Sequence, residues 1–249
     1  MSAPTRFTSG VTQAASYQPL GHIGAPDPFF YAMYEDDFIH YSSGDYTVTA
    51  TGGSVAATAA SGSGGRILLT TGATATNFAE LQLSTASFQY VAGKKLAYLC
   101  RLQVASATTS AFIAGLINTT TAPFTLSNIT DGIYFNKAAA ATDITVLVRT
   151  GSATIGSATI SGALADATDI DLGFYVDRLG NIKIYYGSSL EGVKRQNFAT
   201  LGPEAGILNS ALTGTLTSVL LNPTLAVSNG ATAAAMTGVV DFQYAAQER

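Results

Sequence analysis

The sequence predicts an all-β protein, a jelly-roll-like antiparallel β-sandwich with an extended N-terminal arm. The first observation is a series of short segments from about residue 46 onward, rich in β-branched residues and separated by turn residues. The second is that no long stretch places apolar residues at helical spacing between capping residues, so helices should be few and short. We expect residues 1–40 to form the arm and residues 41–249 to form a single sandwich domain.

The arm is predicted from its prolines and from its lack of any sustained period. Pro4, Pro19, Pro26 and Pro28 fix the backbone and lack an N–H donor, which favours an extended segment over a core element. Large apolar residues are too frequent here for a disordered tail. The arm should therefore lie on a surface, either that of its own domain or that of a neighbour.

The clearest strand is the stretch from Asp169 to Asp177, which alternates apolar and polar residues. Its apolar side chains should face the core, and its acidic side chains should face water or a partner. The turn RLGN leads from it into the run from Ile182 to Tyr186, and the two runs are expected to form a hairpin. Further strands are predicted at 95–104, 111–117, 132–135, 143–149, 216–221 and 238–244.

Two stretches have an unusual composition. The chain carries no charge from Ala205 to Val240, and polar residues and Pro223 interrupt this stretch too often for a membrane span. We expect strands there with one face in the core and the other face against another subunit. The low-complexity stretch SVAATAASGSGG, residues 54–65, is expected to form a loop or a weak edge strand.

The charge balance excludes several classes of protein. Charged residues make up 11% of the chain, against about 25% in an ordinary soluble domain. The net charge is -4 and no Lys/Arg cluster is denser than a pair, which argues against direct nucleic-acid binding.

The N-terminal segment lacks the apolar core of a secretory signal, and no stretch of about 18 apolar residues occurs, so we expect neither export by the general route nor a membrane partner. Cys100, the only cysteine, lies in an alternating apolar run that favours a buried structural thiol.

The stretch PDPFFYAMYEDDF, residues 26–38, concentrates aromatic and acidic residues. A carboxylate pair among Glu35, Asp36 and Asp37 could act in catalysis if burial raised one pKa. Asp37 and His40 could form a dyad, but their spacing also fits a local hydrogen bond where the sandwich begins. We favour a solvated junction between arm and domain, with Phe38 entering the core.

Other catalytic and metal-binding patterns are missing from the sequence. His22 and His40 are the only histidines, and neither HExxH, GxSxG nor a phosphate-binding loop occurs. The sequence therefore predicts no catalytic residue, no cofactor-binding residue and no metal ligand.

The acidic face of the strand at 169–177 leaves two alternatives open. Two carboxylates about 5 to 10 Å apart in a cleft would suit a glycosidase, and acids together with Asn181 would suit calcium. Alternate acids on a strand face are usually only solvated, and we favour that interpretation. Tyr185 and Tyr186 could stack on a sugar, although the absence of Trp weakens a lectin site.

Several stretches, taken in order, resemble the head decoration, or cement, proteins of tailed double-stranded DNA bacteriophages. They extend over the chain from end to end. The stretches are RFTSGVT at 6–12, PDP at 26–28, EDDF at 35–38, AGKKLAYLCRLQV at 92–104, DGIYF at 131–135, LGFYVDRLGNIKIYY at 172–186 and VDFQYAAQER at 240–249.

The resemblance implies a virion structural protein without enzymatic activity or cofactor, made in the host cytoplasm and located on the outer surface of the capsid. It would stabilise the shell by bridging neighbouring subunits of the phage major capsid protein. It would also form a homo-oligomer, and we favour a trimer over a dimer. The alternative is a carbohydrate-binding β-sandwich module of a phage tail or fibre. The residues expected at the interface with the capsid or a neighbouring subunit are Phe7, Val11, Tyr17, Pro19, Leu20, Ile23, Pro26, Pro28, Phe29 and Phe30.

Overall fold

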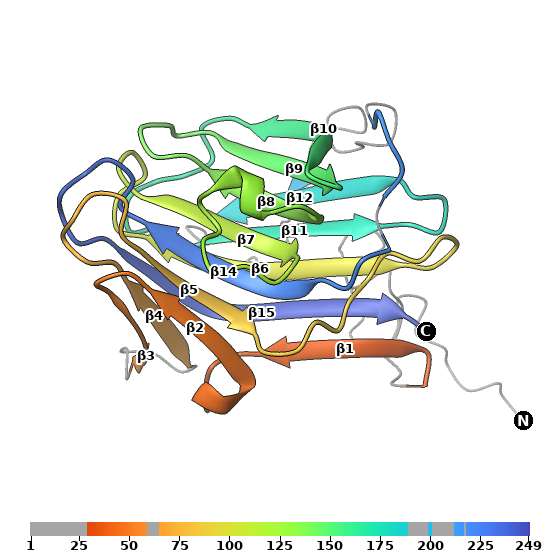
Figure 1. Ribbon diagram of the computed structural model, residues 1–249, viewed down its shortest axis with the longest axis horizontal. Coiled ribbons are helices and arrows are strands. Elements are labelled where there is room, and N and C mark those ends of the chain that lie inside the picture. The colour runs from red at the N-terminus through yellow and green to blue at the C-terminus, as the bar shows by residue number, and fades with distance from the viewer. Residues whose placement is uncertain (1–28, 59–64, 189–198, 201–211, 217) are drawn as a thin grey trace, which may run out of the picture.

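The computed structural model describes residues 29–58, 65–188, 199–200, 212–216 and 218–249. These residues form two antiparallel β-sheets that pack face to face (Figure 1). The prediction of an antiparallel β-sandwich is confirmed. Helical structure in the described residues is limited to two short 3-10 turns, η1 (Ser43–Asp45) and η2 (Leu126–Asn128), and no helix there is long and apolar enough to cross a membrane.

Sheet A has eight strands and sheet B has seven. Sheet A follows the order β13-β12-β11-β6-β15-β4-β3, and β1 pairs with the C-terminal half of β15. Its strands are β1 (Tyr31–Asp36), β3 (Ser54–Thr58), β4 (Arg66–Thr70), β6 (Leu96–Val104), β11 (Ile170–Val176), β12 (Ile182–Ser188), β13 (Ala199–Thr200) and β15 (Thr237–Glu248). Sheet B follows the order β10-β9-β8-β7-β14-β5-β2. Its strands are β2 (Tyr46–Ala50), β5 (Phe78–Leu83), β7 (Ala111–Ile117), β8 (Gly132–Lys137), β9 (Ile144–Thr150), β10 (Ala153–Ile160) and β14 (Asn222–Ser228).

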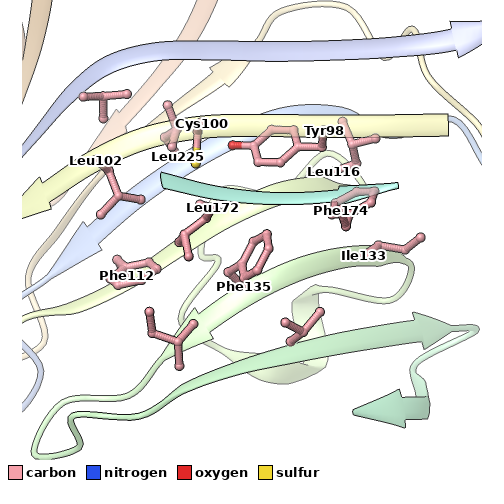
Figure 2. Packing of buried hydrophobic residues seen from close by; sticks show 14 of the residues in the cluster. Tyr98, Cys100, Leu102, Phe112, Leu116, Ile133, Phe135, Leu172, Phe174 and Leu225 are labelled. Atoms are coloured by element: carbon pink, nitrogen blue, oxygen red, sulfur yellow. The ribbon is translucent and has the colours of Figure 1, made fainter. Parts of the chain in front are cut away.

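The main core lies between the two sheets, where alternate residues of each strand interdigitate (Figure 2). Tyr98 of β6 stacks on Phe174 of β11 with ring centroids 5.7 Å apart, and Phe135 of β8 lies 6.4 Å from Phe174 across the core. Cys100 is fully buried beside them, as predicted, and burial raises its thiol pKa to about 12. Each fully buried side chain of this size contributes about 1.5–3 kcal/mol to stability.

The predicted hairpin is confirmed. β11 and β12 pair in register from Val176 opposite Ile182 to Ile170 opposite Ser188. The apolar side of β11 is at most 1% exposed, as its alternation predicts. The other side differs from the prediction, because Tyr175 is 4% exposed and belongs to a second apolar cluster on the outer face of sheet A.

The uncharged C-terminal stretch folds differently from the prediction. Of the range 216–221, where a strand was expected, the described residues form only an isolated bridge at Leu221, and Val219 and Leu220 are 46% and 50% exposed. The strand instead occupies Asn222–Ser228, where Pro223 is tolerated as the second residue of β14. All seven positions of β14 are buried within the chain, between β7 and β5, so neither face of this strand is left for another subunit.

The structure also differs at the end of the range predicted for the arm. Residues 31–36 form β1, which pairs with residues 243–248 of β15. Its side chains alternate between the two faces of the sheet, with Tyr31, Met33 and Glu35 on one face. Phe38 follows and enters the core with 2% exposure, as predicted. Residues 1–28 of the arm lie outside the described residues.

Candidate functional site

A groove of about 550 Å³ lies on the outer face of sheet B, away from the core. Its floor is formed by side chains of β5, β14, β7, β8 and β9, and one wall is formed by residues 122–129. The rings of Phe78 on the floor and Phe124 on the wall lie 6.1 Å apart at 53°, and both are half-buried. Polar lining comes from Thr76, Thr125, Asn136, Lys137 and Ser228.

The floor is largely apolar because β7, at the middle of the sheet, carries isoleucines at outward positions. An antiparallel sheet that faces water usually alternates apolar and polar residues, but Ile113 and Ile117 of β7 point outward and are at most 2% exposed. With Tyr134, Ala226 and the covering Ile129 they form an apolar cluster against Phe124 and Leu147. The outer face of sheet B is therefore a partly covered apolar surface.

Residues 118–131 cover this surface and are fastened at several points. Asn118 and Asp131 close the base of the segment by backbone and side-chain hydrogen bonds of 3.0 and 3.2 Å. Below it, the Gln82 amide group donates to Thr224 Oγ1 at 2.7 Å and accepts from the Thr120 N–H at 3.2 Å. Arg149 Nε donates to Ile129 O at 2.7 Å. These contacts hold the wall of the groove in place.

One buried lysine lies at the rim of the groove. Lys137 of β8 is 0% exposed, and its ammonium donates to the backbone carbonyls of Thr108 and Ser110. Burial lowers its pKa to about 8, and the nearby Asp166 carboxylate partly offsets this effect. Because its donors are directed at the protein's own carbonyls, Lys137 stabilises the loop that contains Ser110.

Glu80 of β5 is the only acidic residue in the strands of sheet B. It shares the outward side of the strand with Phe78 and Gln82, it is 0% exposed, and neither carboxylate oxygen has a hydrogen-bond partner. Burial raises its pKa to about 8, so the group is mainly protonated at neutral pH. Glycoside hydrolysis requires two carboxylates that flank the scissile bond, and sheet B offers one that is protonated and covered.

The two tyrosines considered for sugar stacking both pack against the protein. Tyr185 is 1% exposed in the cluster on the outer face of sheet A, and the half-buried Tyr186 packs against the main core. The structure therefore leaves at most one of these two rings for a sugar. The groove over sheet B is the surface that combines aromatic rings and polar groups, and it was not predicted.

Two of the acids expected to be solvated, Asp169 immediately before β11 and Asp171 on it, form ion pairs instead. Arg101 of β6 donates to both oxygens of Asp171 at 2.6 and 2.9 Å, which raises the arginine pKa, and its guanidinium lies over the Phe242 ring. A register shift in β15 at Asp241 places that carboxylate between Arg101 and Arg66. Arg66 also pairs with Asp169 at 3.0 Å. This network crosses sheet A and leaves neither Asp169 nor Asp171 free for catalysis.

The acidic cluster that precedes β2 has a structural role. Asp36 accepts hydrogen bonds from the Phe38 amide at 2.7 Å and from the Tyr46 hydroxyl, which lies 2.5 Å from the Tyr34 hydroxyl. Asp37 accepts from the Ile39 amide at 3.3 Å, the kind of local hydrogen bond that we favoured over a dyad with His40. These contacts fix the turn that carries the chain from sheet A to sheet B.

The possible calcium ligands Asp177 and Asn181 bind each other. Asp177 accepts from the Leu179 and Asn181 amides at 2.9 Å and from the Asn181 side chain at 2.8 Å, which closes the turn between β11 and β12. Within the described ranges, no group of three or more His, Cys, Asp or Glu residues could hold a metal ion.

The expected interface residues fall mostly outside the described part of the chain. This applies to Phe7, Val11, Tyr17, Pro19, Leu20, Ile23, Pro26 and Pro28. Phe29 and Phe30 are described, and they are 84% and 64% exposed immediately before β1.

The chain matches no protein-family profile and no curated protein. Solved structures with the same fold are found at low sequence identity. Peanut lectin is 7% identical with a TM-score of 0.55, covering 88% of this chain and 97% of that chain. The carbohydrate recognition domain of Emp47p is 11% identical with a TM-score of 0.55, covering 88% and 98%. An endo-1,3-β-glucanase from Streptomyces sioyaensis is 15% identical with a TM-score of 0.54, covering 90% and 99%.

The fold is therefore that of the legume-lectin-like β-sandwiches. At such identities the likeness shows the fold alone, because one fold supports unrelated functions. What the residues can do has to be argued from the groove.

Proposed function

We propose that this chain is a carbohydrate-binding β-sandwich module and that the groove over sheet B is its sugar-binding site. The observation that carries the proposal is the pairing of half-buried rings, Phe78 and Phe124, with the amide of Asn136 and the hydroxyl of Thr125 in one concave surface. Sugars present apolar C–H faces and a rim of hydroxyl groups, which suit aromatic rings and hydrogen-bonding side chains respectively.

Binding without hydrolysis follows from the charges of the site. Sheet B provides a single carboxylate, Glu80, which is covered and has a pKa of about 8. The mechanism is then recognition: the rings exclude water from one face of the sugar while Asn136 and Thr125 fix its orientation. Because no acidic group lies among the lining residues, we expect binding to be independent of metal.

The test is a glycan-array screen, followed by calorimetric titration of the best ligand. We expect Phe124→Ala and Asn136→Ala each to weaken binding at least about tenfold. Tyr186→Phe, a matched change outside the groove, should bind like the wild type, and a chelator should leave binding unchanged. Wild-type affinity in both groove variants would contradict the proposal.

The second candidate function is capsid decoration. The observation that favours it is the position of Phe29 and Phe30, which are exposed where the chain enters β1. A segment that is joined to the chain at Phe29 can reach a neighbouring surface without disturbing the sandwich. In this proposal residues 1–28 bind the capsid lattice.

A further inference from the structure

The groove over sheet B keeps few polar side chains free for a ligand. Twelve of its eighteen described lining residues are apolar or aromatic. Thr76 and Ser228 donate their hydroxyl protons to backbone carbonyls at 2.6 and 2.9 Å. The Thr125 hydroxyl and the Asn136 amide have no hydrogen-bond partner among the described residues. Of the uncharged polar side chains in the lining, these two therefore keep donors for a ligand.

The groove offers a ligand no charge. Lys137, the one charged residue of the described lining, belongs to the core side of β8, which it shares with Ile133 and Phe135. Its side chain is fully buried, and its ammonium donates to carbonyls of the protein. A carboxylate or sulfate group of an acidic sugar would lose its hydration here without gaining a cation. We therefore expect a neutral ligand.

The wall of the groove uses backbone groups within its own turns. The Thr125 amide donates to Ala122 O at 3.1 Å, and the Ile129 amide donates to Leu126 O at 3.3 Å. Pro123 has no N–H to donate. At these positions the backbone of the wall therefore has no donor left for a ligand.

The floor places apolar side chains beside the Asn136 amide. Asn136 of β8 lies directly opposite Ile113 of β7, and Tyr134, on the same side of β8, lies opposite Leu147 of β9. Directly opposite residues have Cβ atoms about 5 Å apart. Ile113, Tyr134 and Ile129 belong to one apolar cluster, and Leu147 packs against it. A ligand group that binds Asn136 therefore has an apolar surface next to it.

We propose that the groove selects a neutral 6-deoxyhexose, with its C6 methyl group against Ile113 and Leu147 and its ring hydroxyl groups at Asn136 and Thr125. This inference rests on the proposed function, because it names the sugar that the groove binds. A hexose with an intact hydroxymethyl group would bury a hydroxyl against the apolar floor, where no described side chain is free to bind it. A methyl group gains from the same burial.

An acetamido sugar also carries a methyl group, but it suits the groove less well. Its amide adds a donor and an acceptor that both need partners when they are buried. Asn136 and Thr125 would be occupied by this amide, and the ring hydroxyl groups would then have no free side chain in the described lining. The small number of free polar groups therefore favours a methyl group that brings no amide with it.

Calorimetric titration of methyl glycosides in matched pairs tests this inference. The pairs are L-fucoside with L-galactoside, L-rhamnoside with L-mannoside, and D-fucoside with D-galactoside, so each pair differs only in the hydroxyl group on C6. In at least one pair the 6-deoxy sugar should bind at least about tenfold more tightly. Equal affinities in all pairs, or tighter binding of the hydroxymethyl sugars, would overturn the inference and leave the proposed function standing.

A glycan array separates the two remaining outcomes. Binding of other glycans, with none of these six sugars bound, would also overturn the 6-deoxyhexose and would leave the groove as a sugar site. An array without any bound glycan would contradict the proposed function itself.

Leu147→Asn supplies the missing hydrogen-bond partner on the floor. This variant should bind the 6-deoxy sugar at least about tenfold more weakly and should lose the preference within the pair. Leu126→Asn makes the same change on the wall, where the side chain is 51% exposed, so it should fold and should also reduce the preference. Leu179→Asn, at an exposed turn outside the groove, is the matched control and should bind like the wild type. An unchanged preference in both groove variants would count against the inference.

Discussion

At the scale of single residues, Glu80 is an ionisable side chain in an environment that does not suit a charge. It is a carboxyl group without a hydrogen-bond partner, fully buried on the outer side of β5. Burial of a charge without a partner costs more than burial of the neutral form, so the folded protein retains a proton that the unfolded chain releases. The neighbouring Gln82 satisfies its polar atoms and carries no such penalty.

Glu80 should make stability fall as pH rises. Its folded pKa is about 8 and its ordinary value is 4.5, so between these values the folded state binds a proton that the unfolded state lacks. The free energy of unfolding should then decrease by roughly 1.4 kcal/mol per pH unit, or about 3 kcal/mol by pH 7. Glu80→Gln should remove this slope in urea unfolding measured from about pH 5 to pH 8. The exposed Glu35→Gln serves as control, and an unchanged slope in Glu80→Gln would refute the assignment.

At the scale of elements, the covering segment at 118–131 depends on one side chain below it. Gln82 joins β14, through Thr224, to the backbone at Asn118 and Thr120. Gln82→Ala should leave these groups unpaired and loosen the wall of the groove, at a cost of about 1–3 kcal/mol. Hydrogen exchange of amides in 118–131 should accelerate, and sugar affinity should fall with it. Gln103→Ala on the other sheet should do neither, and unchanged exchange in Gln82→Ala would show that the base of the segment and Arg149 hold it without Gln82.

The strands show what sequence patterns could and could not predict. β11 and β12 alternate clearly and pair as expected, because one side is core and the other carries polar groups. β14 was missed because Pro223 and the polar residues Asn222, Thr224 and Ser228 look unlike an interior strand, although all of its positions are buried. The groove was missed because outward apolar residues such as Ile113 look like core residues until the topology shows which side they face.

The acids of sheet A illustrate a second limit. Asp169 and Asp171 alternate with apolar residues and therefore look like solvated positions. Their partners Arg66 and Arg101 come from β4 and β6, which lie far away in sequence. Spacing within a strand contains no information about a neighbour that only the sheet order supplies. The register shift at Asp241, which links the two pairs, was not predictable either.

At the scale of the whole molecule, the two ends of the chain contribute differently to the sandwich. β14 and β15 lie inside sheets B and A respectively, so the C-terminal part of the chain provides an interior strand to each sheet. β1, by contrast, pairs with β15 alone. The sandwich should therefore tolerate changes before β1 and should not tolerate the loss of β15.

Deletion of residues 1–28 tests the decoration proposal against this architecture. The truncated chain retains β1 and the whole described core, so its urea unfolding midpoint should equal that of the full chain. If residues 1–28 bind the capsid lattice, the truncated chain should no longer cosediment with phage shells stripped of their decoration protein, while its groove still binds sugar. Full occupancy of the shells by the truncated chain would reject the arm as the anchor. Loss of folding would instead show that residues 1–28 contribute to the sandwich itself.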